Sequence, residues 1–286
     1  VEEYRKPEYK ASIKFAKQQY VGGQDAEATV EAVYYFGGPV AGAQVSYTIY
    51  KSPDYFYYYP DEEADTSFYE DFLSESGGDY GGYGEVALES EGVTDENGLL
   101  KIRIPTKKES HEQRYTVEAT VTDASGRSVE ISGGVMVTPG LFKLQVSTDR
   151  YVSKPNEPVK VTVYAVDYDR KPVGNVRVTV SADLYVEGGR LRGRTRRIDR
   201  REITLDSRGR GVVEFRPKKQ GYLDITAEAR DTQGNDVKCK DSLWIADETW
   251  AGEGYEAPAL ELTLDKKLYN VGDTAKIVIN SPVKDS

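Results

Sequence analysis

Few side chains in this sequence have the type and spacing that covalent or metal chemistry requires. The 286 residues contain one histidine, His111, and one cysteine, Cys239. A Ser-His-Asp triad or a zinc site needs several such groups to converge, but His111 lies in the polar stretch Lys-Glu-Ser-His-Glu with no second histidine or cysteine nearby. We interpret His111 as a solvated loop residue. The sequence therefore predicts no catalytic residue, no cofactor and no metal site, and the chain is not expected to be an enzyme.

Cys239 alternates with Val237 and Asp241 in a run typical of a β-strand. This pattern favours a small buried hydrophobic side chain over a reactive thiol. A single cysteine also excludes an intrachain disulfide, although this does not identify a reducing compartment. Carboxylates are plentiful, but no pattern holds a pair of them opposite each other, as general acid–base chemistry would need.

Two segments carry opposite charge. Residues 52–90 contain eleven acidic residues, seven tyrosines and no basic residue. They fit a binding surface for a basic partner or Ca²⁺, or a solvated and partly disordered insertion, and we favour the insertion. Residues 188–201 contain seven arginines. For this run we favour a long hairpin with arginines facing water or pairing with nearby carboxylates, over binding of nucleic acid or anionic lipid.

The composition narrows the possible environments and partners. The net charge of −10 argues against nucleic acid as a partner, because phosphate binding needs a cationic surface. The mean hydropathy is −0.61, and no apolar run approaches the roughly 20 residues that cross a bilayer, so direct membrane insertion is not expected. The N-terminal Val-Glu-Glu-Tyr is not a signal peptide, and any targeting segment is expected upstream.

The chain repeats itself with a period near 120 residues. Similar segments surround Tyr20, Tyr151 and Tyr269: an alternating apolar and polar run, the tyrosine, a turn rich in Gly, Pro, Asn or Asp, and a second alternating run. Alternation with a period of two places one face of a strand in a core and the other in water. Each copy therefore opens with two β-strands.

The first two copies stay in step well beyond their openings. Each contains two Asp-x-x-Gly turns between alternating runs, at residues 95–98 and 123–126 in the first copy and at 206–209 and 231–234 in the second. The Asp side chain can accept hydrogen bonds from the backbone ahead, and the Gly can take the positive φ of a hairpin. The four matched turns predict that the two copies have the same fold.

Alternating runs number about seven in each full copy, and almost nothing indicates a helix. The predicted fold class is all-β: tandem antiparallel sandwiches of the immunoglobulin or fibronectin-III type, with apolar packing in place of a disulfide. The expected organisation is the end of a preceding domain or a linker at 1–8, a sandwich at 9–138 with an insertion at 52–90, a sandwich at 139–248, a linker at 249–258, and the first strands of a third, truncated sandwich at 259–286.

Two stretches make a family resemblance specific. Residues 262–282, which begin Leu-Thr-Leu-Asp-Lys-Lys-Leu-Tyr-Asn-Val-Gly-Asp, resemble the opening of a macroglobulin domain in the bacterial alpha-2-macroglobulin family. Residues 34–45, Tyr-Tyr-Phe-Gly-Gly-Pro-Val-Ala-Gly-Ala-Gln-Val, followed by Tyr-Lys-Ser-Pro at 50–53, are similar to an earlier macroglobulin domain of the same proteins. The resemblance extends over nearly the whole chain and is weakest in the two charged segments.

The resemblance implies a large protease-trapping protein of the bacterial periplasm or cell surface, in which the parent chain is often anchored by lipid. In that family a protease cuts a bait region, and a Cys–Gln thioester then captures it. Neither element is visible here, since Cys239 is followed by Lys-Asp-Ser. The implied role is scaffold of a broad-spectrum endopeptidase inhibitor. Its implied partners are other domains of the same parent chain and, through bait and thioester regions elsewhere, target proteases.

Two other interpretations remain open from the sequence. A surface adhesin or stalk of immunoglobulin-like repeats would use the Tyr-rich segment as its contact site. An accessory module of a carbohydrate-active enzyme would recognise glycans through Tyr57, Tyr58 or Trp250.

Overall fold

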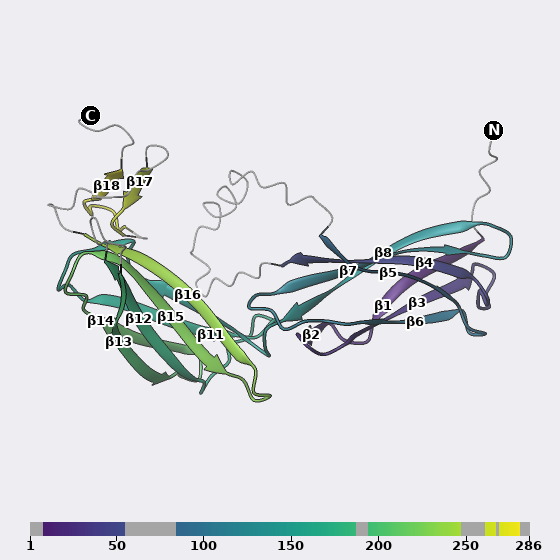
Figure 1. Cartoon of the computed structure of the whole chain (residues 1–286), viewed down its shortest axis with the longest axis horizontal. Coiled ribbons are helices and arrows are strands. Elements are labelled where there is room, and N and C mark those ends of the chain that lie inside the picture. Colours follow the sequence, from purple (N-terminus) through teal and green to yellow (C-terminus); the bar gives the residue numbers. More distant parts are fainter. Residues whose placement is uncertain (1–7, 55–83, 187–193, 247–260, 267–268, 281–286) are drawn as a thin grey trace. The chain divides into compact units, whose positions relative to one another are not determined.

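A computed structural model of the chain describes residues 8–54, 84–186, 194–246, 261–266 and 269–280. The chain divides into two compact units, unit 1 (residues 1–140) and unit 2 (residues 141–286) (Figure 1). The described ranges contain β-strands and no helix, which confirms the predicted all-β class.

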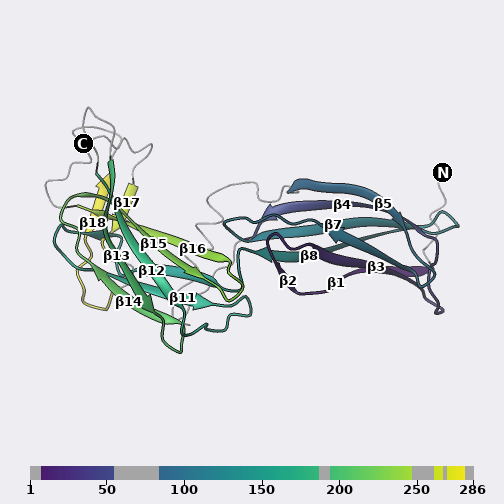
Figure 2. The ribbon, with the colours of Figure 1, turned by 60° about the horizontal axis from the view of Figure 1, so that its bottom comes forward.

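Unit 1 is a sandwich of two sheets. One sheet has the order β1-β3-β6, and the other has the order β2-β8-β7-β4-β5 (Figure 1 and Figure 2). The strands are β1 (Tyr9–Phe15), β2 (Gln19–Val21), β3 (Ala26–Tyr34), β4 (Gln44–Pro53), β5 (Glu85–Val93), β6 (Leu99–Ile104), β7 (Gln113–Thr122) and β8 (Ser128–Thr138).

Unit 2 repeats this topology strand for strand. Its sheets have the orders β9-β11-β14 and β10-β16-β15-β12-β13. The strands are β9 (Lys143–Thr148), β10 (Val152–Ser153), β11 (Val159–Val166), β12 (Arg177–Val186), β13 (Arg194–Thr204), β14 (Arg210–Phe215), β15 (Gly221–Arg230) and β16 (Asp236–Ile245). The internal repeat found in the sequence is therefore a repeat of fold.

Each of the two sandwiches has seven long strands, as predicted, and one short strand that the sequence pattern did not reveal. The short strands β2 and β10 pair in parallel with the last long strand of their unit, β8 and β16 respectively. The tyrosine of the repeat motif explains part of this arrangement in unit 1: Tyr20 in β2 is 3% exposed and joins the core. A strand of two or three residues is too short to show alternation, so its pairing is decided only by the folded sheet.

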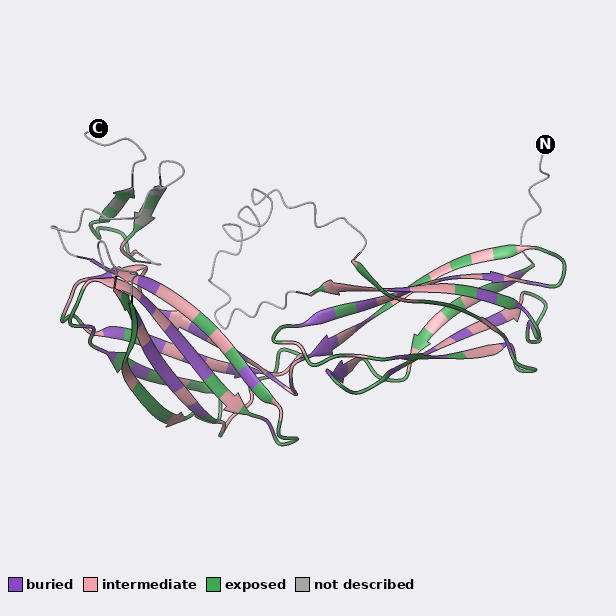
Figure 3. Ribbon diagram, in the orientation of Figure 1, coloured by how far each residue is buried: buried purple, intermediate pink, exposed green. Residues whose placement is uncertain are grey.

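Alternation along the strands builds one core in each unit, as the colouring of Figure 3 shows. In β7, for example, Tyr115, Val117, Ala119 and Val121 are buried, while the residues between them are half-buried. Successive side chains of a strand point to opposite faces, so the apolar set faces the other sheet. The two cores are made by aliphatic and aromatic packing alone, without a disulfide.

All four predicted Asp-x-x-Gly turns are confirmed. The Asp95 Oδ1 accepts hydrogen bonds from the amides of Asn97 and Leu99, both at 2.9 Å, and Gly98 has a φ of 73°. The turns that begin at Asp123, Asp206 and Asp231 have the same two amide bonds, at 2.8 to 3.0 Å, and their glycines have φ between 69° and 83°. Local chemistry thus fixes these reversals, as the sequence indicated.

The edges of the two charged segments are strands. Within the predicted insertion at 52–90, residues 52–53 belong to β4 and residues 85–90 to β5, and the part at 55–83 lies outside the described residues. Residues 194–201 of the arginine run lie in β13, and residues 187–193 are likewise not described. The predicted linker at 249–258 falls in the undescribed range 247–260.

Near the C-terminus, β17 (Glu261–Leu264) and β18 (Ile277–Asn280) form a two-stranded antiparallel sheet. Leu262 and Ile279 face each other in register and are 63% and 62% exposed. The third sandwich proposed for 259–286 stays a prediction.

Candidate interaction surfaces

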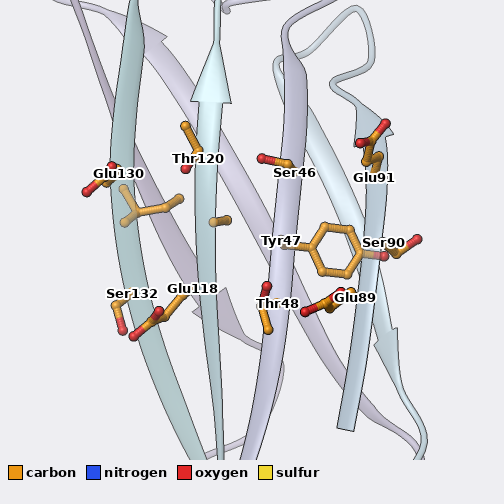
Figure 4. A pocket seen from close by; sticks show the side chains of 12 residues that line it. Ser46, Tyr47, Thr48, Glu89, Ser90, Glu91, Glu118, Thr120, Glu130 and Ser132 are labelled. Atoms are coloured by element: carbon orange, nitrogen blue, oxygen red, sulfur yellow. The ribbon is translucent and has the colours of Figure 1, made fainter. Parts of the chain in front are cut away.

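The outer face of the five-stranded sheet in unit 1, here called the unit 1 face, holds an open depression with a volume of about 840 Å³ (Figure 4). Its residues come from four neighbouring strands: Ser46, Tyr47 and Thr48 of β4; Glu89, Ser90 and Glu91 of β5; Glu118, Ala119 and Thr120 of β7; and Glu130, Ile131 and Ser132 of β8. Because Val45 and Ile49 point into the core, the alternating Ser46 and Thr48 point to solvent.

The cross-strand register sets the pattern of groups on the unit 1 face. One row runs Glu91, Ser46, Thr120, Glu130, and a second runs Glu89, Thr48, Glu118, Ser132. In the first row carboxylates flank the two hydroxyls, in the second they flank Thr48, and no lysine or arginine lines the depression. None of these four glutamates forms an ion pair with another described residue. The face offers hydrogen-bond acceptors and negative charge to whatever approaches it.

Glu118 and Glu130 belong to this face although they lie far from the acidic segment in sequence. The sequence analysis gave them no role, since it treated the acidic residues of 52–90 as one group. The available signal was their position: each occupies a polar place in an alternating run, Thr-Val-Glu-Ala-Thr-Val or Ser-Val-Glu-Ile-Ser. Alternation gives the face of a strand, but only strand order gives the neighbours across the sheet.

The corresponding face of unit 2 has a different electrostatic character, because its carboxylates are paired. Arg197 makes a two-pronged bond to Asp183, at 2.9 and 3.0 Å. The other pairs join cations and carboxylates of the same face at 2.6 to 2.9 Å, namely Arg177 with Glu202, Lys238 with Glu228, and Arg230 with Asp236. The prediction that the β13 arginines face water or pair with nearby carboxylates is confirmed for residues 194–201. Exposed pairs of this kind contribute little to stability, so the contrast concerns recognition more than stability.

Cys239 lies in β16, as its alternating sequence indicated, and its side chain is partly buried. It pairs across the sheet with Ala227, as Ile131 does with Ala119 at the equivalent position of unit 1, and it packs against the unit 2 core. Burial raises the pKa of its thiol to about 12. A thiol that stays protonated is a poor nucleophile and a poor metal ligand, which confirms the hydrophobic interpretation.

His111 is exposed, and its Nδ1 lies 3.2 Å from the hydroxyl of Ser110. No group of three or more metal-ligating side chains converges within the described ranges. The glycan hypothesis cannot be placed, because Tyr57, Tyr58 and Trp250 lie outside the described residues. Within the described residues, no helix has the length and apolar character needed to span a bilayer.

These observations define a class: a tandem β-sandwich protein whose exposed sheet faces differ in charge while its cores and turns are alike. Comparison with known proteins makes the relationship more particular. No family model matches the chain. Among curated proteins, the alpha-2-macroglobulin of Thermotoga maritima is 33% identical over 194 residues, which are 66% of this chain and 11% of that protein. The alpha-2-macroglobulin of Ralstonia nicotianae is 25% identical over 285 residues, 99% of this chain and 16% of that protein.

Solved structures agree in fold. The native conformation of Escherichia coli alpha-2-macroglobulin aligns with a TM-score of 0.52 and 14% identity, over 99% of this chain and 19% of that one. Trypsin-activated alpha-2-macroglobulin from Escherichia coli aligns with a TM-score of 0.54 and 14% identity, over 97% and 19%. The chain is thus related to part of the bacterial alpha-2-macroglobulins, as the resemblance predicted, and it spans 11% and 16% of the two curated relatives named above.

Proposed function

We propose that this chain forms scaffold domains of an alpha-2-macroglobulin-like, broad-spectrum endopeptidase inhibitor. One observation carries the proposal: 99% of this chain matches the alpha-2-macroglobulin of Ralstonia nicotianae. The matched region is only a part of that bacterial protein. Two sandwiches of identical topology, each with its own core, are suited to holding other parts of a large protein at fixed positions. In this role the chain performs no catalysis itself.

The proposal assigns the remaining functions to other parts of the full-length protein. Proteases are engaged through bait and thioester regions outside this chain, and its direct partners are neighbouring domains. The proposed location is extracytoplasmic, in the bacterial periplasm or at the cell surface.

The pair β17–β18 is proposed to open a third sandwich. Its register supports this, because Leu262 pairs with Ile279 and Leu264 with Ile277. Counted from Tyr269, these two pairs occupy the same positions that Ile13–Val30 and Phe15–Ala28 occupy when counted from Tyr20 in unit 1. A lone two-stranded sheet is only marginally stable in water, so further strands are expected to cover the exposed leucines and isoleucines.

The test is a trapping assay on the full-length protein. Trypsin is incubated with it, and residual cleavage of a large protein substrate and of a small peptide substrate is then measured. Loss of large-substrate cleavage with retention of small-substrate cleavage is the expected result, because a caged protease stays active but is screened from large molecules. The 286-residue chain alone serves as control and should leave both activities unchanged. If the full-length protein also leaves both unchanged, the inhibitor proposal fails and an adhesin or stalk becomes the better explanation.

A further inference from the structure

The turn between β3 and β4 of unit 1 exposes two large aromatic side chains. Tyr35 is 67% exposed and Phe36 is 79% exposed. The turn itself is well ordered by hydrogen bonds: the Gly37 amide donates to the Tyr34 carbonyl, and the Tyr34 amide donates to the Gly38 carbonyl, both at 3.0 Å. The two aromatic rings are therefore presented to solvent by a defined backbone.

A stack of rings fixes the position of Phe36. Its ring stacks on that of Tyr34, with centroids 4.9 Å apart and an interplanar angle of 14°. Tyr34 in turn meets the buried Tyr9 edge to face, at 6.2 Å and 76°. Aromatic pairs in these geometries attract each other beyond the effect of area burial. Phe36 is thus held in place before any partner arrives, which reduces the entropy lost on binding.

Unit 2 shows that the fold does not require aromatic residues at the positions of Tyr34 and Phe36, although Tyr168 stands at the position of Tyr35. The same turn follows β11, where the Val166–Pro172 bridge corresponds to Val33–Pro39 in unit 1. In unit 2 the positions of Tyr34 and Phe36 are taken by Asp167 and Asp169. The Asp167 carboxylate accepts hydrogen bonds from the amides of Asp169 and Lys171 at 2.9 and 2.8 Å, so a carboxylate orders this turn where unit 1 has an aromatic ring.

Exposed aromatic clusters of this kind are typical of protein interfaces. Tyrosine and phenylalanine are enriched in interface cores, and well-packed aromatic residues carry much of the binding energy. The glycines leave the surroundings open, because a Cβ added at Gly37 or Gly38 would have no neighbour within 4 Å. The surface can accept a flat apolar partner.

The contacts of Glu8 indicate which partner the aromatic turn would bind. The Tyr35 amide donates to the Glu8 carbonyl at 2.9 Å, and the Glu8 carboxylate pairs with Arg127 at 2.9 Å. Whatever precedes residue 8 in the full-length protein is therefore tethered beside the aromatic turn. A tethered partner meets the turn at a raised effective concentration, about millimolar for a short flexible linker, which favours even a small apolar contact.

We propose that Tyr35 and Phe36 form the docking surface for the domain that precedes residue 8 in the full-length protein, which presents an apolar patch to them. This rests on the part of the proposed function that makes the chain a segment of a longer protein, and it does not depend on protease trapping.

Hydroxyl-radical footprinting with mass spectrometry tests the proposal. The rates of modification of Tyr35 and Phe36 are measured in the full-length protein and in a variant that lacks everything before Glu8. We expect severalfold slower modification in the full-length protein, with Tyr168, in the equivalent turn of unit 2, as the internal control that does not change. Equal rates in the two proteins would overturn the proposal. Protection that survives in the shortened variant, or that rises with protein concentration, would assign the surface to another partner or to a second copy and would overturn it too.

A substitution gives a second, independent readout. Phe36→Ser should leave the shortened variant folded, with an unchanged circular dichroism spectrum, and it should speed the modification of Tyr35 severalfold in the full-length protein. The matched control is Asp169→Ser in unit 2, which should leave the modification rate of Tyr35 unchanged. The trapping assay on the same proteins separates the two proposals: lost trapping with intact protection contradicts the inhibitor function alone, and lost protection with intact trapping contradicts the docking surface alone.

Discussion

The carbonyl oxygen of Ala32 lies 2.5 Å from the point that a Cβ atom on Gly98 would occupy. The Ala32 amide also donates to the Gly98 carbonyl at 2.9 Å, and the Ala32 carbonyl accepts from the Val40 amide at the same distance. The absence of a side chain at Gly98 thus allows the β5–β6 turn to lie directly against the end of β3. In unit 2 the same close approach joins Gly209 to Ala165, also at 2.5 Å.

Gly98→Ala should therefore destabilise unit 1 more than Gly126→Ala does. Both glycines have positive φ, 73° and 79°, but nothing lies within 4 Å of a Cβ on Gly126. The backbone cost is about 1 kcal/mol at either site, and the overlap at Gly98 brings its total to about 3 kcal/mol. Urea unfolding followed by circular dichroism measures the difference. Equal losses for the two variants would show that the turn moves away from Ala32 at little cost.

Asp231 should make unit 2 sensitive to acid. Its side chain is only 7% exposed and accepts hydrogen bonds from the amides of Leu141, Gln233 and Asn235 at 2.8 to 2.9 Å. Burial alone would raise the pKa of Asp231, but the hydrogen bonds from Asn235, Leu141 and Gln233 outweigh it and hold the pKa below its ordinary value.

The sign of the pH effect follows from this lowered pKa. The stabilisation is fully present above the unfolded-state pKa of about 3.9 and is lost as the pH falls through the lower folded-state value. Asp231→Asn should cost about 1.5 kcal/mol at pH 7 and flatten the loss of stability below about pH 4. Urea unfolding followed by tryptophan fluorescence between pH 7 and pH 2 tests this, with Asp169→Asn as an exposed control. An unchanged acid profile in Asp231→Asn would refute the assignment.

Tyr9 should produce the opposite pH dependence in unit 1. Its hydroxyl donates to the Val121 carbonyl at 2.7 Å and to the Arg127 carbonyl at 2.9 Å. Burial, together with the nearby Asp123 carboxylate, raises the pKa of Tyr9 to about 12. The stabilisation is thus complete below about pH 10, the unfolded-state pKa, and is lost as the pH rises toward 12.

Tyr9→Phe should cost unit 1 about 1 kcal/mol at pH 7, since two carbonyls lose their donor. Its stability should then fall less steeply between pH 10 and 12 than that of the unsubstituted protein. Chemical unfolding across this range measures both effects. Tyr35→Phe, at an exposed position, is the control and should change neither. A steep alkaline fall that persists in Tyr9→Phe would attribute it to other groups.

Cys239 should be almost inert to thiol reagents in the native protein. With a pKa of about 12, its thiolate fraction at pH 8 is roughly a thousandfold below that of an unfolded cysteine, whose pKa is about 8.5. Labelling with a chromogenic disulfide at pH 8, with and without urea, tests this. Cys239→Val should retain native stability within about 1 kcal/mol, because it keeps the side-chain volume. Rapid native labelling would show that the strand opens or that the thiol is accessible.

Much of the fold could be predicted because its determinants are local. Alternation in Tyr-Thr-Val-Glu-Ala-Thr-Val at 115–121 assigns the buried and outer faces of β7 without knowledge of its neighbours. The interpretation of Cys239 succeeded for the same reason. The interaction surfaces could not be predicted in this way. The grouping of Glu118 and Glu130 with Glu89 and Glu91 depends on strands that are adjacent in the sheet and distant in the chain.

The sequence by itself determined the all-β class, the internal repeat and the four Asp-x-x-Gly turns, because each depends on side-chain periodicity or on hydrogen bonds within five consecutive residues. Only the tertiary structure decided the strand order, the parallel pairing of β2 and β10, and which charges meet on a sheet face. The physical reason is that strand pairing joins residues far apart in the chain. Its choice depends on which apolar faces pack together in the core, and that is a property of the whole unit.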